Sequence, residues 1–156
     1  NLSDYVELTS YQMYPFYEEV ELTIPDNWMH ARYYNLPIDE LMEVMNNALK
    51  NGYSVCCDGE ESPKSLSHPS GLAILPTNIP EEMINAEIDK WTTLSAKDRE
   101  RKMQSFESPV PEMKVDDNKR QFTFNNRQTT DDHLMHITGM LKDQNGTIYY
   151  KTKNSW

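Results

Sequence analysis

Hydrophobic residues recur along this chain with the two periods that distinguish helices from strands. The clearest helical segment runs from about Ile38 to Asn51. Its apolar residues are three or four positions apart and therefore share one face: Ile38, Leu41, Met42, Met45, Ala48 and Leu49. Gly52 follows as a stop signal, and Tyr53–Cys57 then has the apolar character of a buried strand. The pattern predicts a helix that leads through a glycine into a strand.

Alternating patterns predict further strands, and the last two are separated by a turn. Tyr5–Thr9 and Val20–Ile24 alternate near the start of the chain. Near the end, His133–Leu141 and Thr147–Lys153 flank the pair Asn145–Gly146, whose residues favour a hairpin turn. Antiparallel pairing across this turn brings the two outer ends of the hairpin together. The sequence therefore predicts that the imidazole of His133 and the carboxamide of Asn154 are neighbours.

The middle of the chain is less regular. Residues 58–78 carry turn signals and predict a long surface excursion, whereas 78–91 and 95–106 predict helices with capping residues at their starts. The pattern assigns no element to the polar stretch 116–132. Together the elements predict one α+β domain spanning residues 1–156, with antiparallel strands and a few packed helices.

Composition and charge narrow the range of partners. The chain has 156 residues and a formal net charge of −10, from 25 acidic and 15 basic residues. Nucleic acids and anionic membranes require clustered Lys and Arg, so we expect neither as a partner. No apolar run reaches the length of a membrane span. The acidic balance favours a cationic or free-amine ligand.

The two cysteines, Cys56 and Cys57, are adjacent, and disulfide geometry disfavours a bond between neighbours. We expect both to be apolar strand residues rather than nucleophiles, because reactive thiols need an exposed, electropositive site. A metal site at His133 and His136 is disfavoured because strand residues three apart point to opposite faces. The sequence predicts no metal and no cofactor.

A paired imidazole and carboxamide suits the activation of a thiol. An imidazole can hold a neighbouring cysteine as a thiolate–imidazolium pair, and an acceptor on its other nitrogen fixes its orientation and tautomer. Asn154 can fill that role without adding a negative charge, and Trp156 can shield the hydrogen bond from water.

The blocks Thr129–Gly139 and Lys153–Trp156 resemble parts of papain-like cysteine peptidases, in particular of the aminopeptidase C and bleomycin hydrolase branch. Thr129–Gly139 resembles the block that contains the histidine of this family, and Lys153–Trp156 resembles its Asn-Ser-Trp block. The upstream segments Tyr34–Met42 and Ala48–Val55 are similar to the helix and strand that precede the histidine. The resemblance implies that His133 is the catalytic base, with Asn154 as its orienting partner and Trp156 in support.

The resemblance also implies what lies outside this chain. In that family the nucleophilic Cys and the Gln of the oxyanion hole belong to an N-terminal half, and neither motif occurs here. We therefore expect the C-terminal, β-barrel half of a longer cysteine aminopeptidase, inactive alone and completed by that missing half. The implied substrate is a peptide with a free amino terminus. The family is largely intracellular, and an export signal upstream stays open.

Two further expectations follow from such a division of the enzyme. Such a division exposes the cleft face, so we expect this segment alone to show an apolar patch or to self-associate as a homo-oligomer. The alternative function is a catalytically inactive fragment, or a binding scaffold, that retains the β-rich half.

Overall fold

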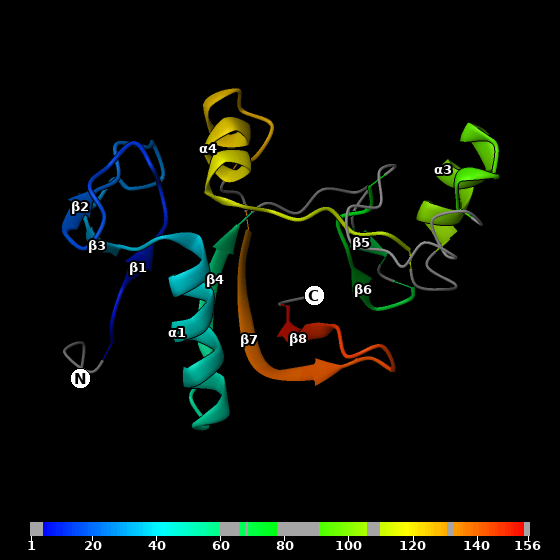
Figure 1. The fold of residues 1–156 in the computed structure, drawn as a ribbon. Coiled ribbons are helices and arrows are strands. Elements are labelled where there is room, and N and C mark those ends of the chain that lie inside the picture. The colour runs from blue at the N-terminus through cyan, green and yellow to red at the C-terminus, as the bar shows by residue number, and fades with distance from the viewer. Residues whose placement is uncertain are drawn as a thin grey trace. The chain divides into compact units, whose positions relative to one another are not determined.

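The computed structural model of this chain describes residues 5–59, 66–67, 69–77, 91–105, 110–130 and 133–154 (Figure 1). The chain divides into two compact units, Asn1–Glu60 with Val115–Trp156, and Glu61–Lys114. Each unit combines helix with antiparallel strand pairs, so the predicted α+β class is confirmed.

In the described residues of the first unit, the chain forms two three-stranded sheets and two helices. Its elements are β1 (Leu8–Thr9), β2 (Glu19–Glu21), β3 (Arg32–Asn35), α1 (Ile38–Lys50), β4 (Val55–Gly59), α4 (Asp117–Asn125), β7 (His133–Lys142) and β8 (Ile148–Lys153). One sheet has the order β1-β3-β2, in which β1 is parallel and β2 antiparallel to β3. The other has the order β4-β7-β8 and is antiparallel throughout.

Helix α1 confirms the predicted amphipathic helix and its glycine stop. Gly52 adopts a φ of +83°, and its amide donates to the carbonyl of Leu49 (3.2 Å). The amide of Tyr53 donates to the carbonyl of Ala48 (3.0 Å). This pair of bonds satisfies carbonyls that the end of a helix leaves unpaired, and it directs the chain toward β4.

Helix α4 forms within the polar stretch to which the sequence pattern assigned no element. Asp116 caps it by accepting a hydrogen bond from the amide of Lys119 (2.7 Å). The next residue, Asp117, accepts from the hydroxyl of Ser10 (3.3 Å) and from the amide of Ile38 (2.9 Å). Because Pro37 gives α1 no side-chain cap, a carboxylate from α4 serves that helix end instead.

A buried asparagine organises the sheet formed by β1, β2 and β3. Asn35 has an exposed fraction of 0%, and its carboxamide oxygen accepts from the amide of Tyr11 (2.9 Å). Its nitrogen donates to the carbonyls of Tyr11, Tyr14 and Pro15 at 2.9–3.2 Å. This side chain therefore fixes the loop between β1 and β2, and its own polar groups are all paired.

The strands of this sheet are shorter than the sequence pattern predicted. Tyr5–Thr9 is paired only at Leu8–Thr9, and the second strand occupies Glu19–Glu21 rather than Val20–Ile24. Only two or three residues on each side pair with β3, although the carbonyl of Glu7, just before β1, also accepts a hydrogen bond from the amide of Tyr34 (2.9 Å).

Helix α1 contacts β7 and β4 on one face of the second sheet (Figure 1). On that face Val55 of β4 lies opposite Ile137 of β7, and Ile137 is buried. The other face is open, so the prediction of a buried strand at Tyr53–Cys57 is wrong. The observed strand, Val55–Gly59, alternates between half-buried and exposed residues, with Cys56 exposed.

The second unit contains β5 (Leu66–Ser67), β6 (Leu72–Ala73) and α3 (Ala96–Ser105). The antiparallel pair β5–β6 lies within the predicted surface excursion, and α3 confirms the helix predicted for 95–106. Ser95 caps α3 by accepting from the amide of Asp98 (3.1 Å). The helix predicted at 78–91 lies outside the described residues except for Trp91. No helix in the described part of the chain has the length and apolarity needed to cross a membrane.

Candidate functional site

The candidate site lies at the open end of the β7–β8 hairpin, so the turn at the closed end sets its geometry. Asp143 accepts hydrogen bonds from the amides of Asn145 (2.9 Å) and Thr147 (2.8 Å) through one carboxylate oxygen. Gly146 adopts a φ of +88°. The predicted turn is confirmed, with the left-handed conformation at the glycine, where it costs least.

At the open end, Nε2 of His133 lies 2.9 Å from Oδ1 of Asn154, across 21 positions of sequence. His133 is the first residue of β7, and Asn154 directly follows the last residue of β8. Both side chains are half-buried. The predicted proximity of the imidazole and the carboxamide is therefore confirmed. Trp156, predicted to shield this bond, lies outside the described residues.

This contact determines which ring nitrogen of His133 carries a proton. A carboxamide oxygen only accepts hydrogen bonds, so Nε2 of His133 must be the donor to Asn154. In a neutral imidazole the other nitrogen, Nδ1, is then the basic one. The arrangement can therefore accept a proton at Nδ1 while Asn154 holds the ring in place.

The two histidines of β7 occupy different faces of the sheet. His133 is half-buried and Ile137, four residues later, is buried, so both belong to the face that α1 covers. His136 is exposed on the open face. Within the described residues, no group of three or more metal-ligating side chains is placed to hold an ion.

Alternation also separates the two cysteines of β4. Cys57 lies opposite Met135 on the face of His133, whereas Cys56 lies opposite His136 on the open face. The Cys57 thiol donates to the carbonyl of Asp58 (3.6 Å). The structure thus places one thiol on the histidine's face, and that neither cysteine is the nucleophile stays a prediction.

Two features of the site were absent from the sequence interpretation. The first is Thr138, an unpaired extra residue in β7 whose hydroxyl donates to the carbonyl of Lys151 (3.2 Å). Counting residue pairs back from the turn could have shown that β7 needs one extra residue for Asn154 to lie on the face of His133. The second is the hydrogen bond from the Tyr150 hydroxyl to Asn46 of α1 (2.7 Å), which ties β8 to the helix. Burial raises the pKa of Tyr150, and the bond to Asn46 partly opposes that rise.

No protein-family model matches this chain, and no curated protein matches it significantly.

Proposed function

We propose that this chain is the histidine- and asparagine-bearing portion of a cysteine aminopeptidase of the papain-like type. The single observation that carries the proposal is the 2.9 Å contact between Nε2 of His133 and Oδ1 of Asn154. The contact supports it because a thiol peptidase of this type uses an imidazole whose other nitrogen is held by a third group, here a neutral carboxamide. The motif resemblance around both residues adds independent support.

The chemical role of His133 follows from the position of its protons. Nδ1 takes the proton of a cysteine thiol, and the thiolate attacks the carbonyl carbon of the scissile peptide bond. The imidazolium then returns that proton to the leaving amine, which gives a thioester and a shortened peptide. In the second half, Nδ1 accepts a proton from water as the water attacks the thioester, and the thiol is regenerated.

Asn154 keeps Nε2 protonated through this cycle and prevents the ring from turning. Its neutrality matters, because a carboxylate at the same place would put a second negative charge beside the thiolate. The nucleophilic cysteine and an oxyanion-stabilising Gln come, in this proposal, from a part of the enzyme that precedes this chain.

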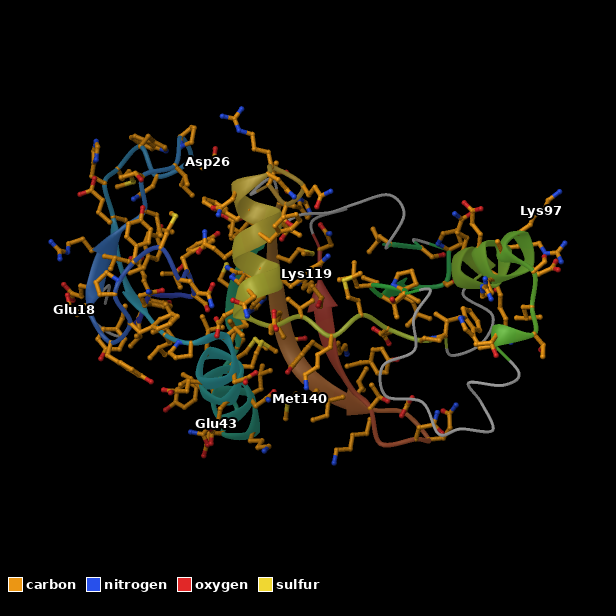
Figure 2. The ribbon with its side chains drawn as sticks, turned by 45° about the horizontal axis from the view of Figure 1, so that its top comes forward. Glu18, Asp26, Glu43, Lys97, Lys119 and Met140 are labelled. Carbon is orange, nitrogen blue, oxygen red and sulfur yellow. The ribbon has the colours of Figure 1, made fainter. Side chains whose placement is uncertain are left out.

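The proposed substrate class is peptides with a free amino terminus, and the charge of the chain supports it. With a net charge of −10, the surface attracts cationic groups and repels anionic ones. Acidic side chains such as Glu18, Asp26 and Glu43 are exposed and extend outward in Figure 2. Long-range attraction of this kind weakens with added salt.

The test is hydrolysis of aminoacyl reporter amides by the full-length product of the gene that encodes this chain. His133→Ala should reduce kcat/KM by about 10²–10⁴-fold, the usual contribution of a positioned acid–base group. His136→Ala is the matched control, because that ring lies on the open face of the same strand, and it should leave the rate within about twofold of the wild type. Full activity in the His133 variant would refute the proposal, and a folded full-length protein without any turnover would favour the binding scaffold.

A further inference from the structure

Strand β7 contains one residue more than the part of β8 that faces it. Gly139 lies opposite Lys151, but the next pair joins Ile137 to Thr152. Between these pairs β7 advances by two residues and β8 by one. Thr138 is therefore the additional residue of a β-bulge, and Figure 1 shows that β7 bends along its length, as bulged strands do.

The bulge decides which side chain of β7 Asn154 can meet. Beyond it, His136 lies opposite Lys153, so the next step of the ladder places Asn154 opposite Met135. Met135 is two residues from His133, so all three side chains are on one face, in agreement with the observed hydrogen bond. An unbulged ladder counted from the turn would instead place Asn154 opposite His136, whose ring points to the other face.

Burial of apolar surface contributes little to the register of the end of β8. Thr152 and Lys153 are exposed, so sliding them by one residue removes almost no apolar surface from contact. The facing part of β7 is held more firmly, because Ile137 is buried and paired with Val55 of β4. The specific bond at the bulge is the one from the Thr138 hydroxyl to the backbone carbonyl of Lys151.

We infer that Thr138 is a positioning residue: its hydroxyl selects the bulged register in which Asn154 faces His133. Without that bond, the shifted register competes, and Asn154 turns to the open face. His133 then loses the acceptor that holds its proton on Nε2. The structural part of this inference stands on the hairpin alone, and its catalytic consequence rests on the proposed function.

The structural part is tested by NMR on the ¹⁵N-labelled 156-residue chain. Long-range ¹H–¹⁵N correlations report the tautomer of His133, and cross-strand backbone NOEs report the register of β8. In the wild type we expect the Nε2–H tautomer, an NOE between the His133 ring and the Asn154 carboxamide, and Lys153 paired with His136. Thr138→Val keeps the shape and removes the hydroxyl, so Lys153 should then pair partly with Ile137 and the tautomers should mix.

Thr138→Ser restores a hydroxyl and should restore the wild-type pattern. Thr152→Val is the control, an exposed threonine of β8 to which the described structure gives no side-chain hydrogen bond, and it should change neither readout. NOEs between β4 and β7 verify folding, and Thr138→Ala replaces the valine variant if that one does not fold. A wild-type tautomer and register in a variant without the hydroxyl would overturn the inference, as would a serine variant that behaves like the valine variant.

Kinetics of the full-length protein separate this inference from the proposed function. If both are right, Thr138→Val lowers kcat by up to about 10²-fold, the scale of misplacing a reacting group, with little change in KM. If the register shifts in the NMR experiment but His133→Ala keeps full activity, the positioning role stands and the proposed function fails. If His133→Ala is inactive but the register does not shift, the proposed function stands and the positioning role of Thr138 fails.

Discussion

Nε2 of His133 and Oδ1 of Asn154 lie 2.9 Å apart because one hairpin returns the chain to its own start. The relationship depends on three local features: a turn closed by Asp143, a ladder of backbone pairs, and one bulge at Thr138. Each feature determines the path of the hairpin backbone. The backbone therefore brings the two side chains together, and neither side chain determines the contact by itself.

Removing the carboxamide should impair the histidine without removing it. In the full-length protein, Asn154→Ala removes the acceptor that holds the proton of His133 on Nε2, so kcat should fall on the order of 10²-fold while KM changes little. Steady-state kinetics on an aminoacyl reporter measure the effect. Asn145→Ala, in the exposed turn of the same hairpin, is the control and should stay within about twofold of the wild type. Equal losses in the two variants would show that the hairpin, not the carboxamide, carries the effect.

The capping of α1 by another helix predicts a stability change at Asp117. Asp117→Ala removes the acceptor of both the Ser10 hydroxyl and the Ile38 amide, so the free energy of unfolding should fall by about 1–3 kcal/mol. Urea unfolding followed by circular dichroism measures it. The exposed Asp26, replaced in the same way, should cost less than about 0.5 kcal/mol. An Asp117→Ala variant as stable as the wild type would mean that these hydrogen bonds do not stabilise the helix.

Asn35 should be among the most sensitive positions in the β1-β3-β2 sheet. Asn35→Ala leaves the amide of Tyr11 and three carbonyls without their buried partner, so unfolding free energy should fall by about 3 kcal/mol. Asn51 is the contrasting case, an exposed asparagine that bonds locally within the end of α1. Its alanine variant should lose less than about 1 kcal/mol, and chemical denaturation of both variants side by side decides the comparison.

Alkaline pH should destabilise the first unit through two tyrosines. The hydrogen bond to Glu40 raises the pKa of Tyr17, and burial raises that of Tyr150. A folded-state pKa above the ordinary tyrosine value near 10 means that the folded protein favours the neutral phenol. The stability that the neutral tyrosine contributes is therefore fully present below about pH 10. It is lost as the pH rises through the folded pKa.

Urea midpoints at pH 8 and pH 11 measure this loss, and the midpoint should be lower at pH 11. Tyr17→Phe and Tyr150→Phe remove the titrating groups, so each should reduce the difference between the two pH values. If the urea midpoint of both variants falls between pH 8 and pH 11 as much as that of the wild type, the alkaline loss of stability comes from other groups.

The parts of the fold that the sequence predicted are those whose signals are local. Helix α1 follows from its own periodicity and from Gly52, and the hairpin follows from alternation around Gly146. The contact between His133 and Asn154 is also local in this sense, since only the hairpin separates the two residues.

The parts that the sequence did not predict depend on long-range partners. Helix α4 has weak amphipathic character and is joined to the loop after β1 through hydrogen bonds that Asp117 and Gln121 accept, which a hydrophobic pattern cannot reveal. Burial of Cys56 failed as a prediction because α1 covers only one face of the sheet. Counting pairs from the turn could have shown that β7 contains an extra residue. The sequence does not show which residue that is, because a bulge has no strong residue-type signature.

The central claim is that His133 activates a thiol, and the pH dependence of thiol alkylation in the full-length protein tests it most directly. In the wild type, one cysteine should react with iodoacetamide as a thiolate well below the ordinary cysteine pKa of about 8.5, because an imidazolium stabilises it. In His133→Ala the same cysteine should react only as the pH approaches that ordinary value, whereas His136→Ala should keep the wild-type profile. Identical profiles in the wild type and in His133→Ala would contradict the account.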